Sequence, residues 1–382
     1  MLVYICFYII TVVLSYLLAR DAAQTKARRP NISYKKVVFG SFIVMWLFIG
    51  CRYGVGRDYP AYALDYRDTT LWDFGTPISK YKYEYGYYAI LLVARFFDMG
   101  PQMLFIIASG LTLFLFFRLF RNRIEYLPIA ILVFFIALPY TFIINGLRQG
   151  IAIMCFLNSL EYLQKNGRIF RDCVCYLLWI LIASLFHTSA LYLIVLLVLK
   201  LDLIQNRFSS VILCALAVSG LLLNIVGLSD LFLPNIEDQG GYSYGAIISS
   251  DDRFQMESEG LSLGKLLSLT IYLIPLFFYD QIKKRYSNYH VSFIMLAIGS
   301  AVFYMFPNNI FATRVAYYFL FSEVLIYPIL FRYLLKDSPS STHSLVCVVI
   351  FLGFVLIQLK EFGGFYQNQI WPNASIFGFP IK

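Results

Sequence analysis

Four short segments of the sequence combine charged or polar side chains with glycines, small residues or aromatic rings. Arg52–Tyr59 reads RYGVGRDY, Asn145–Ala152 reads NGLRQGIA and His187–Ala190 reads HTSA. The fourth, Tyr81–Tyr88, reads YKYEYGYY and carries Glu84. A guanidinium group recognises phosphate through a planar fork of donors, whereas a carboxylate or an imidazole can accept a proton. These residue types therefore favour an anion-binding site with acid–base groups available to it.

The RYGVGRDY segment has two interpretations. Gly54 and Gly56 allow tight backbone turns or a close approach of the backbone to a ligand. Arg52, Arg57 and Asp58 then either close an outer loop as an Arg–Asp pair or form an anion-binding loop. The segment is not a dinucleotide fingerprint, because no strand precedes it and the third glycine is missing.

The NGLRQGIA segment places Arg148 and Gln149 at the start of a helical pattern. Arg148 shares one helix face with Ala152, Cys155 and Ser159, and small residues on that face favour close helix packing. An arginine near a helix N-terminus adds to the positive end of the helix dipole, which suits an anion site better than it suits helix stability. The alternative is an arginine that snorkels to the membrane interface.

The remaining candidates are a lone histidine and a group of tyrosines. His187 is either a hydrogen-bonded structural residue or a catalytic group. Tyrosine offers a rigid face on which sugar rings stack, and it also populates the aromatic belt of membrane proteins. The tyrosines that could contact carbohydrate are Tyr59, Tyr83, Tyr85 and Tyr87.

The composition decides which class of protein must position these residues. Of the 382 residues, 60% are hydrophobic and only 14% are charged, against about 45–50% and about 25% in soluble domains. This excludes a soluble enzyme, a secreted disulfide scaffold and a disordered protein. The seven cysteines show neither metal-binding spacing nor a disulfide framework, and we predict no metal site and no cofactor.

The apolar runs predict an all-α polytopic membrane protein with about twelve transmembrane helices, each close to the roughly 20 residues that a crossing requires. The expected spans lie near 2–19, 37–51, 101–118, 126–143, 147–163, 173–187, 188–201, 209–227, 263–280, 291–306, 314–335 and 343–359. The stretch near 87–98 is short and contains Arg95. We predict a re-entrant or interfacial helix there, with a short crossing as the alternative.

Lysine and arginine set the orientation of these spans. The basic loops near 20–36, 118–123, 165–171, 200–207, 283–285 and 332–336 fall on one face, which we assign to the cytoplasm. Both termini are then outside, as are two longer loops, 52–100 with the re-entrant segment and 228–262. The chain, 1–382, is expected to form a single membrane domain.

The same topology sorts the polar residues. Those expected together on the outer face are Arg52, Asp58, Glu84, Arg148, His187 and Arg314. Glu323 lies within the expected span 314–335, and we predict that it is an interior hydrogen-bonding residue.

The order of these motifs resembles the EpsG family of Wzy-like polymerases of bacterial surface polysaccharides. The resemblance is carried by RYGVGRDY, by Glu84 with Gly86 and Tyr87, by NGLRQGIA and by FHTSA, with Arg314 a looser match. Arg57 departs from the family pattern, where a small residue, often threonine, is expected.

The resemblance implies a GT-C-like fold in the bacterial cytoplasmic (inner) membrane. It implies that undecaprenyl-pyrophosphate-linked oligosaccharide repeat units, as donor and acceptor, are polymerised by glycosyl transfer on the periplasmic or outer face. The expected partners are the membrane lipid, a chain-length regulator and a flippase. No nucleic-acid partner is expected. The residues expected on pyrophosphate are Arg52, Arg148, Arg314, Arg57 and Gln149, with Asp58, Glu84 and His187 as alternative bases.

Three other functions are compatible with parts of the pattern. An O-antigen ligase or another GT-C glycosyltransferase would use similar chemistry on a different acceptor or donor. A lipid-linked oligosaccharide flippase would spread its polar residues across the membrane and show related halves, whereas the polar candidates here gather on one face. A membrane acyltransferase would use an intramembrane histidine, a role open only to His187 among the outer residues.

Overall fold

The computed structural model describes residues 13, 16–17, 32–56, 58–70, 84–164, 168–200, 207–227, 263–307 and 309–367. These residues form helices and connecting turns, with no strand among them, so the all-α prediction is confirmed for this part of the chain. The packing divides the chain into two compact units, one of Met1–Asn206 with Glu323–Lys382 and one of Arg207–Ser322. Each unit is described by itself.

In the first unit, α2 (Ile32–Gly50) pairs with α5 (Gln102–Leu119). The indole Nε1 of Trp46 donates a hydrogen bond to the Ile106 carbonyl at 2.7 Å, and the Gln102 side chain donates to the Gly50 carbonyl. Gly110 allows the close approach, because a Cβ there would lie 2.7 Å from Trp46 Nε1. The C-terminus of α2 therefore lies beside the N-terminus of α5.

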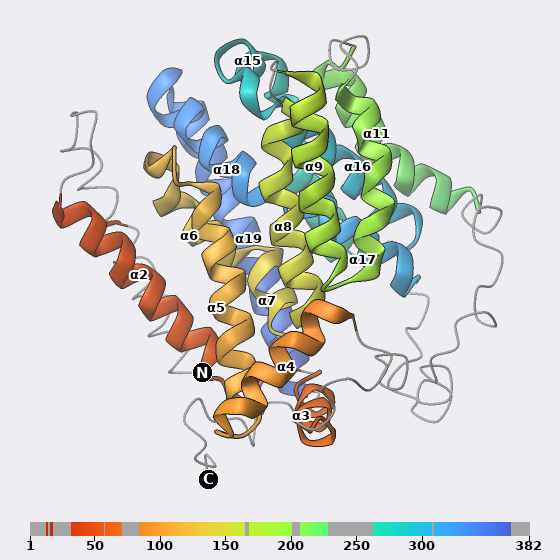
Figure 1. Ribbon diagram of the computed structural model, residues 1–382. Coiled ribbons are helices and arrows are strands. Elements are labelled where there is room, and N and C mark those ends of the chain that lie inside the picture. Colours follow the sequence, from red (N-terminus) through yellow and green to blue (C-terminus); the bar gives the residue numbers. More distant parts are fainter. Residues whose placement is uncertain are drawn as a thin grey trace. The chain divides into compact units, whose positions relative to one another are not determined.

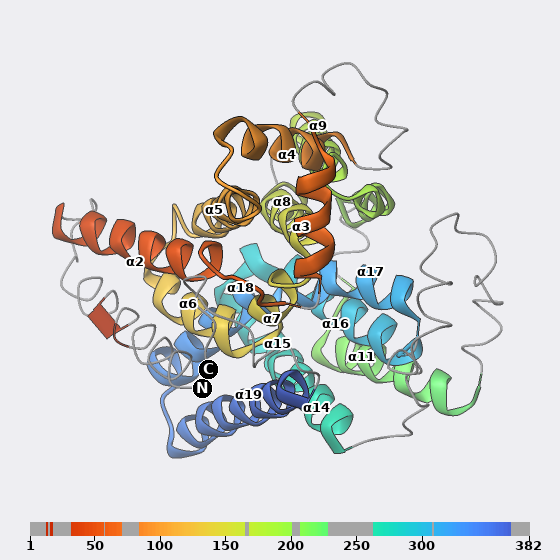
Figure 2. The same cartoon turned by 90° about the horizontal axis from the view of Figure 1, so that it is seen from below.

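Two short helices, α3 (Tyr59–Asp68) and α4 (Tyr85–Phe97), lie near the start of α5 (Figures 1 and 2). In α3 the buried residues Tyr59, Tyr62, Ala63 and Tyr66 follow helical spacing and form one covered stripe. The 13 residues of α4 extend about 20 Å, less than the roughly 30 Å of a hydrocarbon core. The helix near 87–98 is thus present and short, as expected for an interfacial segment, and its place in a bilayer stays a prediction.

The next segment folds as η3 (Ile124–Tyr126), α6 (Leu127–Ile136) and α7 (Leu138–Ile143). The expected span 126–143 is therefore broken, because Ala137 is extended, at φ −113° and ψ −167°, and Pro139 follows at the start of α7. The carboxylate of Glu323 accepts a hydrogen bond from the Leu138 backbone N–H at 3.1 Å and so satisfies a donor at the break. Glu323 is fully buried, and its predicted role as an interior hydrogen-bonding residue is confirmed.

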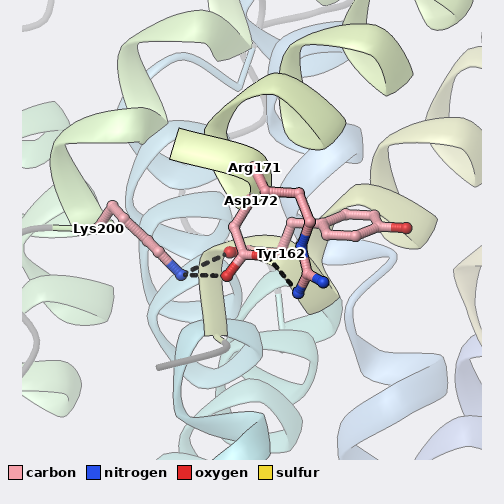
Figure 3. A network of polar contacts seen from close by, with 4 residues as sticks. All are labelled: Tyr162, Arg171, Asp172 and Lys200. Atoms are coloured by element: carbon pink, nitrogen blue, oxygen red, sulfur yellow. Dashed lines mark hydrogen bonds and ion pairs between the residues drawn. The ribbon is translucent and has the colours of Figure 1, made fainter. Parts of the chain in front are cut away.

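The helices α8 (Leu147–Gln164) and α9 (Ile169–Ser184) form an antiparallel pair, and the 3-10 helix η4 (Thr188–Lys200) packs beside both. A polar cluster around the buried Asp172 joins the ends of all three (Figure 3). Lys200 Nζ donates to the Tyr162 carbonyl at 2.8 Å and lies 3.4 Å from the carboxylate of Asp172, which Arg171 also reaches at 3.3 Å. The unit ends with α18 (Glu323–Arg332), the π-helical turn η8 (Tyr333–Asp337) and α19 (Ser341–Gln367).

The second unit contains α11 (Ser210–Ile225), α14 (Leu263–Phe277), α15 (Tyr279–Arg285), η7 (Ser287–Tyr289), α16 (His290–Met305) and α17 (Ile310–Leu320). Gly220 of α11 lies directly against α16, since a Cβ there would clash with the Ala301 carbonyl oxygen. Asn224 donates to the Met305 carbonyl at 3.1 Å and extends the same contact.

Among the described residues, three stretches are long and apolar enough to cross a membrane, Gln102–Leu119, Ser287–Met305 and Phe311–Asp337, and several shorter apolar helices accompany them. This agrees with a membrane-embedded protein. The number of twelve spans stays a prediction, because the expected span 2–19 and the outer loop 228–262 lie almost wholly outside the described residues. The organisation as a single membrane domain likewise stays a prediction.

Candidate functional site

The candidate residues of the first unit gather where four helices begin or end. Arg148 lies at the start of α8 and His187 lies just after the end of α9, and the antiparallel arrangement of these helices brings both to one end. Arg52 follows α2, whose C-terminus pairs with the start of α5, and Glu84 precedes α4. Residues far apart in sequence thus share one end of the unit.

Among these candidate residues, Glu84 and Arg148 contact each other directly. Nη1 of Arg148 lies 2.7 Å from Oε2 of Glu84, and their side chains are 26% and 13% exposed respectively. The guanidinium also lies over the ring of Tyr87, 5.2 Å from its centroid. A charge-assisted hydrogen bond and a cation–π contact therefore hold one partly accessible arginine.

Tyr87 is in turn fixed by Asp65, a residue of α3 that the sequence analysis did not select. The Tyr87 hydroxyl donates to Oδ2 of Asp65 at 2.8 Å, and the Tyr87 side chain is fully buried. Burial raises the pKa of Tyr87, and the neighbouring Asp65 carboxylate raises this pKa further. The tyrosine spacing of α3 was the signal that could have predicted this helix and so placed Asp65 beside its covered stripe.

A glycine joins the start of α4 to the end of α9. The Gly86 N–H donates to the Leu185 carbonyl at 2.7 Å, and a Cβ at Gly86 would lie 2.7 Å from the same oxygen. Glu84 stands two residues before Gly86 and His187 two residues after Leu185, so this contact brings both to one junction. His187 Nδ1 lies 2.6 Å from the Ser189 hydroxyl, which sets the orientation of the imidazole.

Arg52 lies at the same end of the unit and is buried, only 3% exposed. Its guanidinium donates to the Ile49 carbonyl at 2.8 Å and the Ile144 carbonyl at 3.4 Å, and it lies 4.7 Å from the Phe105 ring centroid. Gly56, at φ 108°, approaches the same Ile144 carbonyl so closely that a Cβ would lie 2.6 Å from it. The glycine of this turn therefore serves a tight backbone approach, and the turn braces the segment that leads into Arg148.

The other predicted anion ligands and bases lie as follows. Asp58 is half-buried at the start of α3, where its carbonyl accepts from the Tyr62 N–H. Gln149 is buried, 3% exposed. Arg314 is exposed on α17 of the second unit, and Arg57 lies outside the described residues.

The tyrosines predicted to contact sugar differ in exposure. Tyr59 stacks on Phe105 with centroids 4.4 Å apart, and protein covers both Tyr59 and Tyr87. Tyr85 is 67% exposed, and Tyr83 lies outside the described residues. Sugar stacking in this structure is therefore open to Tyr85, whereas the rings of Tyr59 and Tyr87 would first have to be uncovered.

The arrangement combines a partly accessible guanidinium, a carboxylate paired with it and an oriented imidazole nearby. Such a set can bind an anionic leaving group and accept a proton. Within the described ranges, no three histidine, cysteine, aspartate or glutamate side chains come close enough together to hold a metal ion.

The sequence matches one known protein family. The model of the EpsG family matches residues 35–375, nearly the whole chain. No curated protein matches the sequence, and no solved structure matches the fold. The matched range contains every candidate residue named above.

Proposed function

The chain belongs to the EpsG family of Wzy-like polysaccharide polymerases, and we propose that it polymerises undecaprenyl-pyrophosphate-linked oligosaccharide repeat units. The product would be O-antigen, capsule or exopolysaccharide. The association of the family with polysaccharide polymerisation, which is a glycosyl transfer, supports a glycosyltransferase of this type.

The reaction has simple requirements. A hydroxyl oxygen of the acceptor sugar bonds to the anomeric carbon of the donor, and the bond between that carbon and the pyrophosphate oxygen breaks. The leaving group gains negative charge as the bond breaks, so a fixed cation beside it lowers the barrier, typically by a few kcal/mol for each donor. The hydroxyl proton passes to a base.

The observation that carries the proposal is the partly accessible Arg148–Glu84 pair, held over Tyr87 at one end of the helices. Arg148 is the principal pyrophosphate ligand in this proposal. Arg52 contributes fixed positive charge at the same end of the unit, and Arg314, Arg57 and Gln149 are further candidates for the same group. Glu84, His187 and Asp58 are the candidate bases, and Tyr85 is the tyrosine best exposed for sugar contact.

We further propose that this end faces the periplasm or the outer side of a bacterial cytoplasmic membrane. The 18 residues of α8 extend about 27 Å, close to the roughly 30 Å of a hydrocarbon core. Arg148 lies in the first turn of this helix, and the Lys200–Asp172 cluster lies near its other end. The basic residues of that far end, Arg118, Arg171 and Arg332, follow the positive-inside rule if it is cytoplasmic. The twelve-span topology with both termini outside and a GT-C-like fold belong to this proposal, as do a chain-length regulator and a flippase as partners.

Deletion of the gene in the source bacterium tests the function. Polymerase activity predicts loss of the long-chain glycan ladder, while single lipid-linked units persist on the outer side. Units trapped on the cytoplasmic side would indicate a flippase instead. A normal ladder would contradict the proposal.

A further inference from the structure

We infer that Glu84 occupies the phosphate position on Arg148 in the ligand-free protein, and that the donor pyrophosphate displaces it. The released Glu84 carboxylate then takes the proton of the acceptor hydroxyl. This inference rests on the proposed function, because it assigns an exchange of partners to that same site. It selects Glu84 from the three candidate bases and links its availability to donor binding.

The two partners of Arg148 differ in how firmly they are held. The ring of Tyr87 belongs to the covered side of α4 and is anchored by the hydrogen bond to Asp65. Glu84 is the N-cap residue of α4, and its side chain makes no capping hydrogen bond to the helix. The Glu84 carboxylate forms an ion pair with Arg148, and its side chain retains 13% exposure. The carboxylate can therefore rotate away while the ring keeps the guanidinium in place.

The incoming group competes well for this arginine. A pyrophosphate carries more charge and more acceptor oxygens than a carboxylate, and both present oxygens to the same planar fork. The backbone of the junction need not move, because Gly86 is fixed to Leu185 and Arg148 is fixed in the first turn of α8. Exchange therefore requires only a change of the Glu84 side-chain rotamer.

The exchange leaves the proton and the charges balanced. Donor binding frees an ionised carboxylate next to the leaving group. The acceptor oxygen bonds to the anomeric carbon, its proton goes to Glu84, and the bonding electrons of the broken bond leave with undecaprenyl pyrophosphate on Arg148. When this product departs, Glu84 loses the proton to water and pairs with Arg148 again.

Binding of undecaprenyl pyrophosphate to the purified full-length protein in lipid nanodiscs tests the exchange. Glu84→Gln removes the competing charge, so the affinity should rise, by about twofold to fivefold for a partly exposed ion pair. The same variant should lose at least about 100-fold in polymerisation, because the base is gone. Glu84→Asp keeps a carboxylate on a shorter arm and should bind at least as tightly as wild type while it retains part of the turnover.

A second ion pair of the same unit supplies the matched control. Arg332 pairs with Glu125 at 3.7 Å and lies over Tyr126, 5.4 Å from the ring centroid. Glu125→Gln should change neither affinity nor turnover, and thermal unfolding of each variant reports on folding.

The outcomes separate the exchange from the function. Equal or weaker binding by both Glu84 variants, with normal binding by wild type, would overturn the exchange and leave the polymerase proposal standing. Near-normal turnover by Glu84→Gln would also overturn it. A wild-type protein that does not bind undecaprenyl pyrophosphate would instead contradict the donor class of the proposed function.

Discussion

The guanidinium of Arg148 contacts both the carboxylate of Glu84 and the ring face of Tyr87. The first contact neutralises its charge, and the second fixes its place without using its donors. The Asp65–Tyr87 hydrogen bond extends this set of contacts to α3. At the residue scale, the site is therefore a cation with one ionic partner and one anchored ring.

Substitution of Tyr87 separates the ring from the hydroxyl. Tyr87→Phe loses the hydrogen bond to Asp65, about 1 kcal/mol, but keeps the ring beneath Arg148. Tyr87→Leu loses both, and the cation–π contact adds about 0.5–2 kcal/mol. Polymer synthesis should fall less than about tenfold in Tyr87→Phe and clearly further in Tyr87→Leu, measured by initial rates in membranes with matched protein levels. Equal loss in both variants would show that the ring does not position Arg148.

Sequence reasoning recovered part of this site. Arg148, Glu84 and His187 were selected because charged and polar groups on one membrane face stand out against an apolar chain, and the structure brings them to one junction. Asp65 was missed because it belongs to a helix within a segment taken as loop. The burial of Arg52 depends on the Ile144 carbonyl, a tertiary contact that no local pattern encodes.

At the element scale, glycine contacts decide where helices meet. Gly86 of α4 touches the Leu185 carbonyl, so a methyl group there must push backbone apart. Gly40, within α2, lies beside open space, because a Cβ at this position would have no neighbouring atom within 4 Å. The two positions form a natural pair for comparison.

Gly86→Ala should destabilise the protein by about 1–3 kcal/mol and reduce polymer synthesis by tenfold or more, because the shift moves Glu84 and His187 relative to Arg148. Gly40→Ala should be neutral or slightly stabilising, since alanine favours a helix. Thermal unfolding in detergent and polymer yield measure the two effects. Full activity in Gly86→Ala would mean that the α4–α9 junction does not organise the site.

The cluster at the opposite end holds three helices through one buried carboxylate. Asp172 is fully buried, and Lys200 meets it while also reaching the Tyr162 carbonyl (Figure 3). Removal of one partner of a buried ion pair leaves an uncompensated charge, at a cost of about 3–5 kcal/mol. Lys200→Met should therefore lower the unfolding temperature strongly.

The double variant Lys200→Met with Asp172→Asn should recover part of that loss, because it removes the orphaned charge as well. A double variant less stable than Lys200→Met would contradict the assignment of Asp172 as the charge that Lys200 compensates.

The helices themselves were predictable to different degrees. The long apolar runs gave α2, α5, α8 and α16 close to their observed bounds. The breaks at Ala137 and between Leu320 and Glu323 were not predicted, because each lies within an apolar run long enough to be one span, and Pro139 or Glu323 does not by itself end a helix in such a run. The hydrogen bond between Glu323 and Leu138, 185 residues apart, stabilises the first break.

At the scale of the whole molecule, the predicted membrane topology rests on the distribution of lysine and arginine among the loops. Much of the basic excess behind the net charge of +9 lies in the short loops that are predicted to be cytoplasmic, whereas the candidate site pairs basic with acidic groups. From this distribution, the positive-inside rule predicts that the site faces the outer side of the membrane. This prediction requires that α4 does not cross the membrane, because a crossing there would place every later basic loop on the opposite face.

Cysteine labelling in intact cells tests this orientation. Tyr85 is 67% exposed near the site, and Phe170 is 83% exposed at the start of α9, beside the basic end. Tyr85→Cys should react with a membrane-impermeant maleimide from outside, above the background of the native cysteines. Phe170→Cys should react only after the cells are permeabilised. The reverse pattern would invert the topology.

In the proposed mechanism, Arg148 holds the pyrophosphate of a lipid-linked donor. The most direct measurement is the surface glycan ladder of a deletion strain that carries Arg148→Ala, with Arg332→Ala as the matched arginine variant and equal membrane levels of both. We expect polymer synthesis to fall by at least about 100-fold with Arg148→Ala, whereas Arg332→Ala should restore the ladder. A normal ladder in Arg148→Ala would contradict this role of Arg148.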